Sequence, residues 1–180
     1  MKEKRILIAV DLQKDFIDGA LGTKEAVAIV PAAAARIREY RERGDDVFAT
    51  LDTHGADYME TQEGRKLPVP HCIRGTEGWQ LDPAIREAAG DAALVEKPTF
   101  GSVRLPELIR ERLAPDETPV VGLIGLCTDI CVVSNALLLK AFMPEVPICV
   151  DAACCAGVTP EKHLAALETM RSCQIEVKNA

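Results

Sequence analysis

Aromatic residues, long hydrophobic runs and basic clusters are scarce or missing in this sequence. Only 4% of the 180 residues are aromatic, with a single Trp, so aliphatic side chains must form the core. Lys and Arg number 21 against 28 Asp and Glu, a formal net charge of −7 with no local basic patch, which argues against binding to nucleic acid or to an anionic membrane. The apolar run before Asp11 is too short for a signal peptide or a membrane span.

The seven cysteines are the unusual feature of the composition. An odd count leaves at least one thiol outside any full disulfide pairing, and no Cys-x-x-Cys motif is present to suggest a zinc knuckle or a redox centre. Without a secretion signal, we expect a reducing, cytoplasmic location in which disulfides are rare. Most of these cysteines are therefore expected to be small core residues, with one reactive thiol among them.

Strands and helices are predicted to alternate along the chain. Short aliphatic runs predict strands at 6–10, 47–51, 92–96, 119–125, 146–150 and 174–177, and helices are expected at 31–43, 104–113, 130–143 and 160–172. This alternation predicts an α/β fold in three α/β/α layers, with a mostly parallel sheet of about six strands. We expect one domain over residues 1–180, in which the long polar segment 53–91 is a functional loop.

Polar side chains follow the predicted strands at the points where they end. Asp11 follows the first strand, Asp52 and His54 the second, and Lys97 the third. The segment 126–131 follows the fourth strand and Asp151 the fifth. Ligands of open α/β sheets bind beyond the carboxyl ends of strands, so we expect a site at this edge.

Cys131 is the candidate nucleophile of that site. It lies where a helix is predicted to begin, and a helix N-terminus lowers the pKa of a thiol and can bind an oxyanion. Asp11 can accept the thiol proton, and the ammonium of Lys97 favours the charged forms of both partners. From position alone, Cys131 could equally be a buried structural cysteine, and each charged residue could be an ordinary loop residue.

Asp52, His54 and His71 form a second group that suits a divalent metal. Imidazole and carboxylate groups bind Zn²⁺, Mn²⁺ or Fe²⁺. Glu60 and Glu63 lie in the same polar segment, and either can add a carboxylate. The spacing alone is a weak signal, because Asp and His are common in loops.

Several segments, taken together, resemble the isochorismatase-like cysteine hydrolases and, within them, the nicotinamidases. They are AVDLQKDFIDGALG, LDTH, HCIRGTEG, VEKPTFGS, GLCTDICVVSNAL and VDAACCAG, in the family's order from residue 5 to about 177. The resemblance implies Asp11 as acid/base, Lys97 as the catalytic lysine and Cys131 as the nucleophile. It also implies that Asp52, His54 and His71 are metal ligands.

The resemblance further implies a thioester mechanism. Asp11 would deprotonate Cys131, and the thiolate would attack an amide carbonyl. Backbone N–H groups of Cys127 and Cys131 would hold the oxyanion, with a cis peptide between Leu126 and Cys127. In nicotinamidases the metal binds the pyridine nitrogen and orients the ring.

The sequence departs from the nicotinamidase pattern at two positions. Pro68 stands where an aromatic residue usually stacks on the pyridine, and Thr53 replaces the Trp of the usual Asp-Trp-His. Phe16 and Phe100 are the candidate pocket walls, with Trp79 a weaker one. As fourth metal ligand we choose Glu63 over Glu60, because it lies nearer His71 in the sequence.

The leading hypothesis is hydrolysis of nicotinamide to nicotinate and ammonia, which would place the protein in NAD salvage. The main alternative is an amidase for another small amide or carbamoyl compound. A metal-independent isochorismatase-type hydrolase would leave the metal group without a role, and a non-catalytic binding protein would not need Asp11, Lys97 and Cys131. The sequence leaves open whether the chain forms a homo-oligomer.

Overall fold

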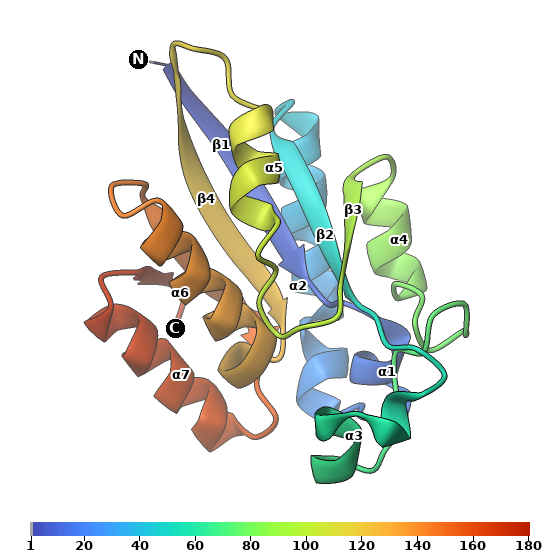
Figure 1. The fold of residues 1–180 in the computed structure, drawn as a ribbon. Helices are drawn as coiled ribbons and strands as arrows, with labels where there is room; N and C mark the ends of the chain where they lie inside the picture. The colour runs from blue at the N-terminus through green and yellow to red at the C-terminus, as the bar shows by residue number, and fades with distance from the viewer. Residues whose placement is uncertain (1) are drawn as a thin grey trace.

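The computed structural model describes residues 2–180, which form a six-stranded sheet with helices on both faces (Figure 1). The strands are β1 (Lys2–Val10), β2 (Asp46–Asp52), β3 (Ala93–Lys97), β4 (Glu117–Leu126), β5 (Ile148–Ala156) and β6 (Glu176–Lys178). The α-helices are α1 (Lys14–Ile17), α2 (Lys24–Glu42), α3 (Gln62–Lys66), α4 (Pro83–Ala89), α5 (Leu105–Glu111), α6 (Val133–Phe142) and α7 (Pro160–Ser172). A 3₁₀ turn at Tyr58–Glu60 and a π-helical turn at Thr128–Val132 complete the elements.

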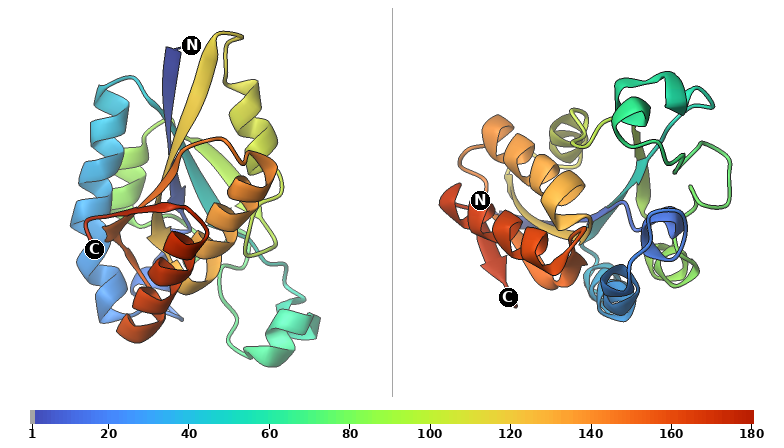
Figure 2. Two further views of the ribbon diagram at one scale, coloured as in Figure 1. Left: turned by 90° about the vertical axis from the view of Figure 1, so that its left-hand side faces the viewer. Right: turned by 90° about the horizontal axis from the view of Figure 1, so that it is seen from below.

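The sheet has the strand order β3-β2-β1-β4-β5-β6, and all of its neighbouring pairs are parallel. Its central strands are apolar on both faces, and β1 has no residue more than 1% exposed from Ile6 to Val10. Helices α2 and α4 cover one face of the sheet, and α5, α6 and α7 cover the other (Figure 2). Their buried side chains form two hydrophobic clusters with those of the strands, one on each face. The three-layer α/β/α fold predicted from the sequence is confirmed.

The strand order places a topological switch point between the neighbouring strands β1 and β4. The chain continues from β1 to α2 on one face of the sheet, and from β4 to α6 on the other. The connections after these neighbouring strands therefore diverge, and such a divergence is where open α/β sheets bind ligands. The segments after β1 and after β4 carry Asp11 and Cys131, respectively.

The helix predicted at 31–43 begins earlier than the sequence indicated. Helix α2 starts at Lys24, where the hydroxyl of Thr23 accepts a hydrogen bond from the N–H of Ala26, and Pro31 lies inside the helix instead of at its start. A proline there removes the hydrogen bond to the carbonyl of Val27. Both residues lie on the exposed side, where water can pair with that carbonyl. The prediction failed because an interior proline is tolerated on a solvated face.

Two other expectations change. The polar segment 53–91 is not one loop, because it contains α3, α4 and the 3₁₀ turn. Strand β5 runs six residues beyond the predicted end at residue 150, so Asp151 lies within the strand. Its carboxylate pairs with Arg36 at 2.7 Å, and it is not part of the site at the carboxyl ends of β1 to β4.

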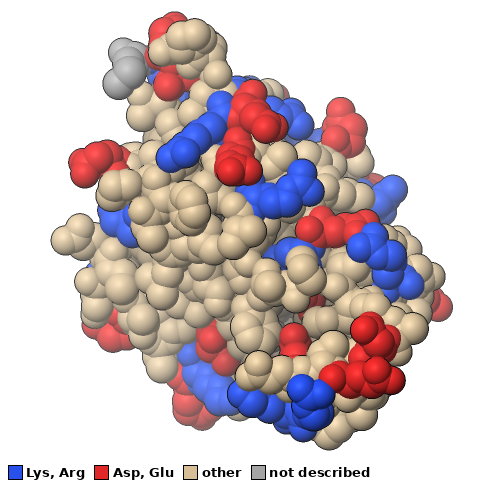
Figure 3. All heavy atoms as spheres, viewed as in Figure 1, with Lys and Arg blue, Asp and Glu red and all other residues tan. Residues whose placement is uncertain are grey.

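The surface charges of the molecule are mixed. On the face shown in Figure 3, basic and acidic side chains are interspersed and form no broad patch of one sign. Among residues 2–180, no helix is both long enough and apolar enough to cross a membrane.

Candidate active site

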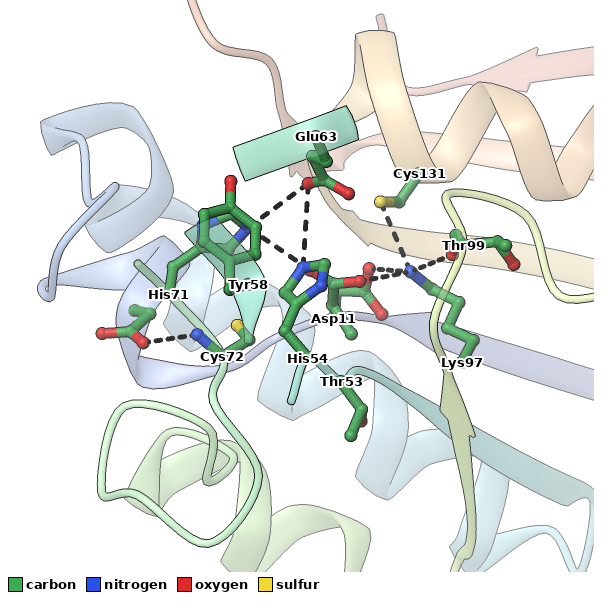
Figure 4. Close-up of polar contacts among 12 residues, drawn as sticks. Asp11, Thr53, His54, Tyr58, Glu63, His71, Cys72, Lys97, Thr99 and Cys131 are labelled. Atoms are coloured by element: carbon green, nitrogen blue, oxygen red, sulfur yellow. Dashed lines mark hydrogen bonds and ion pairs between the residues drawn. The ribbon is translucent and has the colours of Figure 1, made fainter. Parts of the chain in front are cut away.

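Asp11, Lys97 and Cys131 meet at the carboxyl-terminal edge of the sheet, after β1, at the end of β3 and after β4, respectively (Figure 4). The Nζ atom of Lys97 lies 2.6 Å from Oδ2 of Asp11 and donates hydrogen bonds to Sγ of Cys131 at 3.4 Å and to the backbone oxygen of Thr99 at 3.1 Å. The side chain of Asp11 is fully buried, and that of Lys97 is 1% exposed. The ammonium therefore links the candidate base to the candidate nucleophile away from bulk water.

The position of Asp11 is set by the neighbouring strand β2. Its backbone N–H donates to the carbonyl and to the hydroxyl oxygen of Thr50, and that hydroxyl donates to Oδ1 of Asp11 at 2.6 Å. Asp11 has a φ of 48°, in the left-handed region that residues other than glycine rarely adopt. These contacts hold the backbone in that conformation and aim the carboxylate at Lys97.

Cys131 lies in the π-helical turn before α6, and such turns are frequent at functional sites. Its backbone carbonyl accepts a hydrogen bond of 2.8 Å from the side-chain amide of Asn135. The amide oxygen of Asn135 accepts from the N–H of Ser102, which ties the turn to the segment after β3. The peptide bond between Leu126 and Cys127 is cis, as the resemblance implies.

Burial decides the protonation of the candidate nucleophile. Desolvation raises the pKa of Cys131 well above its usual value, the carboxylate of Asp11 raises it further, and Lys97 only partly opposes them. This increase in the pKa outweighs the decrease expected from a helix N-terminus, so the resting thiol of Cys131 keeps its proton. Burial also raises the pKa of Asp11, despite Lys97, which makes that carboxylate a better proton acceptor. Burial disfavours the ammonium of Lys97, but the carboxylates of Asp11 and Asp52 outweigh that cost and raise its pKa.

Asp52, His54, Glu63 and His71 form a compact cluster whose ligand atoms all lie within 4.8 Å of one another. Oδ2 of Asp52 lies 2.9 Å from Nε2 of His54 and 3.5 Å from Nε2 of His71. Oε1 of Glu63 lies 3.7 Å and 3.6 Å from the same two nitrogens. Asp52 ends β2, while Glu63 and His71 come from α3 and the segment after it.

This donor set fits a divalent metal. Ligand atoms about 2.0–2.2 Å from a tetrahedral zinc ion lie about 3.3–3.6 Å from one another, close to the spacings of this cluster. Nδ1 of His71 lies 2.8 Å from the carbonyl oxygen of Val69, which can only accept, so the neutral ring keeps its Nε2 lone pair for the cluster. Burial would raise the pKa of Asp52, but the adjacent His54 and His71 side chains and the ammonium of Lys97 lower it and keep the carboxylate charged.

Aromatic rings hold the two imidazoles in place. The buried ring of Tyr58 lies edge-on to His54 at 4.8 Å and to His71 at 5.0 Å, and its hydroxyl donates to the carbonyl of Leu67. The ring of Phe16 lies 5.5 Å from His71. These contacts restrict rotation of both rings.

A cavity of about 600 Å³ opens between the two groups of side chains. Its walls include Cys131 from one group and Asp52, Glu63 and His71 from the other. The apolar part of the wall comes from Phe16, Leu21, Leu67, Phe100, Ile130 and Val158.

Of the residues that the sequence proposed for the pocket wall, the two phenylalanines line the cavity and the tryptophan does not. Phe16 and Phe100 line the cavity, and Phe100 is 48% exposed, at the rim. Among the described residues that line the cavity, neither Trp79 nor Pro68 appears. The indole N–H of Trp79 instead donates to the hydroxyl of Thr53 at 2.9 Å, a contact available because Thr53 replaces the usual Trp.

Sequence reasoning missed four residues that support the site. Gln13, Thr50 and Asn135 make contacts that join segments far apart in the chain, so no local pattern marks them. The fourth is Tyr58, whose ring contacts those of His54 and His71. For Gln13 a signal existed, since it lies between Asp11 and Asp15 in the segment AVDLQKDFIDGALG, which carries part of the family resemblance. The structure brings Glu63 to the cluster, whereas Glu60 is not part of it.

The chain is similar to known hydrolases over nearly its whole length. A nicotinamidase/pyrazinamidase of Mycobacterium tuberculosis is 31% identical, with 96% of this chain and 97% of the relative aligned. The crystal structure of a nicotinamidase/pyrazinamidase from Bacillus subtilis has a TM-score of 0.82 at 29% identity, covering 98% of this chain and all of the other. A Pyrococcus horikoshii pyrazinamidase solved in complex with zinc has a TM-score of 0.78 at 28% identity, covering 97% and 98%.

The family model that matches this chain is the isochorismatase domain, over residues 5–180. That match includes every strand end and every side chain described above. The chain therefore belongs to the isochorismatase family.

Proposed function

We propose that this protein hydrolyses a small amide, with nicotinamide as the first candidate, giving the acid and ammonia through a thioester on Cys131. The observation that carries the proposal is the position of the Lys97 ammonium, 2.6 Å from Asp11 and 3.4 Å from Cys131. Of these three residues, Cys131 lines the cavity, which also reaches Asp52, Glu63 and His71 of the cluster. The nicotinamidase and pyrazinamidase relatives support this choice of substrate class. An unpaired nucleophilic thiol also suits a reducing, cytoplasmic location.

The proposed reaction starts with the neutral thiol. Asp11 takes the proton of Cys131 as the sulfur attacks the amide carbonyl, and the ammonium of Lys97 stabilises the carboxylate before transfer and the thiolate during it. The backbone N–H groups of Cys127 and Cys131 stabilise the negative oxygen of the tetrahedral intermediate. Asp11 returns the proton to the leaving nitrogen, so ammonia departs and a thioester remains.

Water completes the reaction. Asp11 accepts a proton from the attacking water, and the second tetrahedral intermediate collapses to release the acid and the thiolate. The thiolate then recovers the proton from Asp11. In total, one amide and one water become one acid and one ammonia.

We propose that Asp52, His54, Glu63 and His71 hold a divalent metal, with Zn²⁺ preferred and Mn²⁺ or Fe²⁺ as alternatives. Bound there, the metal would supply a Lewis-acidic anchor for a nitrogen or oxygen atom of the substrate. Phe16 packs beside His71 and offers one apolar wall for the same substrate.

One feature of the cavity favours a second candidate substrate. Leu21, Leu67, Ile130 and Val158 give it a largely aliphatic wall, and Pro68 occupies the usual position of the stacking aromatic residue. Such a wall also suits a small aliphatic amide or a carbamoyl compound. Ammonia release should therefore be measured over nicotinamide, pyrazinamide and small carbamoyl compounds, with and without added metal. Turnover of any of them supports an amidohydrolase, the preferred one identifies the substrate class, and no turnover of any contradicts the proposal.

Removal of the metal is expected to abolish ammonia release. Exhaustive chelation followed by buffer exchange should leave only background activity, because the substrate loses its anchor while Asp11, Lys97 and Cys131 remain in place. Adding back Zn²⁺, Mn²⁺ or Fe²⁺ should restore turnover, and the order of recovery identifies the preferred ion. Full activity in a protein shown by elemental analysis to be metal-free would contradict the role of the cluster.

Replacement of the fourth ligand is expected to weaken metal binding selectively. Glu63→Gln removes the charge that Oε1 places near both imidazoles, so zinc affinity should fall by at least about tenfold in a competition assay with a chromogenic chelator. Glu60→Gln is the matched control, since it makes the same change three residues away and outside the cluster. Equal affinities of the two variants would remove Glu63 from the site.

A further inference from the structure

The turn after β1 carries two polar side chains that the proposed reaction does not use. In the segment Asp11 to Phe16, the side chains of Gln13 and Asp15 both point to backbone atoms of other segments. Lys14, between them, reaches Glu77 on the surface instead. This pattern suggests that the same short segment holds both the candidate base and parts of the metal cluster.

Gln13 is fully buried, and its side-chain amide pairs with both polar atoms of one backbone residue. Its Oε1 accepts from the N–H of Asp52 at 2.8 Å, and its Nε2 donates to the carbonyl of Asp52 at 2.9 Å. The same Nε2 donates to the carbonyl of Trp79 at 2.8 Å. The pairing of β1 with β2 ends at Val10 and Thr50. Beyond that point, the amide of Gln13 supplies the hydrogen bonds that a longer β1 would have made to the backbone of Asp52.

Asp15 makes the corresponding contact to the second metal segment. Its Oδ2 accepts from the backbone N–H of Cys72 at 2.8 Å, immediately after His71. Cys72 is fully buried and has a φ of 47°, and its carbonyl accepts from the N–H of His54 at 3.0 Å. Cys72, the residue after His71, is thus fixed at its N–H by the carboxylate of Asp15 and at its carbonyl by the backbone N–H of His54.

A glycine makes room for this carboxylate. A Cβ atom at Gly78 would lie 2.2 Å from Oδ1 of Asp15, and the carbonyl of Gly78 accepts from the N–H of Asp15 at 3.0 Å. The carboxylate is therefore held between Gly78 and Cys72, with little freedom to shift.

We propose that Gln13 and Asp15 are positioning residues for the metal cluster. Gln13 fixes the backbone of Asp52, and Asp15 fixes the backbone beside His71. Because both belong to the turn that begins with Asp11, they also fix the position of the candidate base relative to the metal ligands. This inference rests on the proposed metal site, and it does not require that the substrate be an amide.

The test measures metal binding, without any dependence on turnover. Gln13→Met keeps the volume but removes all three hydrogen bonds, and Asp15→Ala removes the acceptor for Cys72. Each is expected to weaken zinc binding by about 10–100-fold in competition with a chromogenic chelator, as loss of groups that orient ligands generally does. In the Co²⁺-loaded proteins, the visible absorption bands should shift or weaken, because the ligand geometry changes.

Two further variants separate positioning from general damage. Asp15→Asn can turn its amide oxygen to Cys72 and should recover most of the affinity, whereas Gly78→Ala should displace the Asp15 carboxylate and reproduce the loss. Lys14→Gln is the control from the same turn and should bind zinc like the unaltered protein. Circular dichroism and thermal unfolding of the metal-free proteins identify any variant that fails to fold.

The outcomes are distinct. Folded Gln13→Met and Asp15→Ala proteins with unchanged zinc affinity and cobalt spectra would overturn the inference. An unaltered protein that binds zinc but releases ammonia from no amide would refute the proposed function, and losses in the variants would still support this inference. An unaltered protein that binds none of Zn²⁺, Mn²⁺ and Fe²⁺ would overturn the proposed metal site and this inference with it, whereas ammonia release alone decides the proposed amide hydrolysis.

Discussion

Cys131→Ala is expected to reduce ammonia release by on the order of 10⁴- to 10⁶-fold, the usual cost of removing a covalent nucleophile. Without the sulfur no thioester can form, and Asp11 and Lys97 have no proton to move toward product. The cavity and the metal cluster remain, so zinc affinity should be unchanged. Initial rates with the preferred amide, measured at saturating metal, provide the comparison.

A matched thiol variant gives the control for this prediction. Cys173→Ala removes an exposed cysteine far from the candidate site in the sequence and should retain full activity. Brief reaction of the unaltered enzyme with substrate, followed by acid quench and mass spectrometry, should also show the acyl group on the peptide that contains Cys131. Full ammonia release by a folded Cys131→Ala protein would show that another group is the nucleophile.

Lys97→Met is expected to produce the largest loss of stability as well as loss of turnover. The ammonium is 1% exposed and lies 2.6 Å from Asp11 and 3.6 Å from Asp52, so its removal leaves buried carboxylate charge without its partner. Breaking a buried ion pair in this way typically lowers the free energy of unfolding by about 3–5 kcal/mol. Denaturant unfolding of the metal-free protein, followed by circular dichroism, measures the change.

If unpaired buried charge causes the loss of stability in Lys97→Met, that loss should depend on Asp11 and on pH. Adding Asp11→Asn to Lys97→Met should restore part of the stability, because it removes the uncompensated carboxylate. The deficit should also shrink as the pH falls, since burial raises the pKa of Asp11 and a protonated Asp11 needs no partner. Lys14→Gln breaks an exposed ion pair and should leave the unfolding midpoint unchanged. A folded Lys97→Met protein as stable as that control would contradict the proposed electrostatics.

Periodicity predicted the architecture well and the helix boundaries less well. Aliphatic runs located all of the strands, because a parallel sheet covered on both faces must be apolar throughout its centre. The start of α2 was wrong by seven residues, since Pro31 was taken as a first-turn residue when it is an interior one on a solvated face. The helices between residues 53 and 91 were missed because the 3₁₀ turn, α3 and α4 span only three, five and seven residues, which is too short to show a clear period.

Local sequence supplied the reactive groups of the candidate site but not their relations. That Asp11, Lys97 and Cys131 each follow a strand is visible in the chain, and parallel strands bring their carboxyl ends to one edge. The choice of Glu63 over Glu60 rested only on its shorter separation from His71 along the chain. The structure gives a geometric reason, because Oε1 of Glu63 lies close to Nε2 of both His54 and His71.

The sequence by itself therefore determined the fold class, the family and the set of chemical groups, because these depend on periodicity and on motifs that are continuous in the chain. Only the tertiary structure decided which groups touch, which are desolvated and what holds them. The protonated resting state of Cys131 follows from burial, which is a property of packing. The roles inferred for Gln13 and Asp15 depend on hydrogen bonds to residues 39 and 57 positions away, and contacts over such separations exist only once the chain has folded.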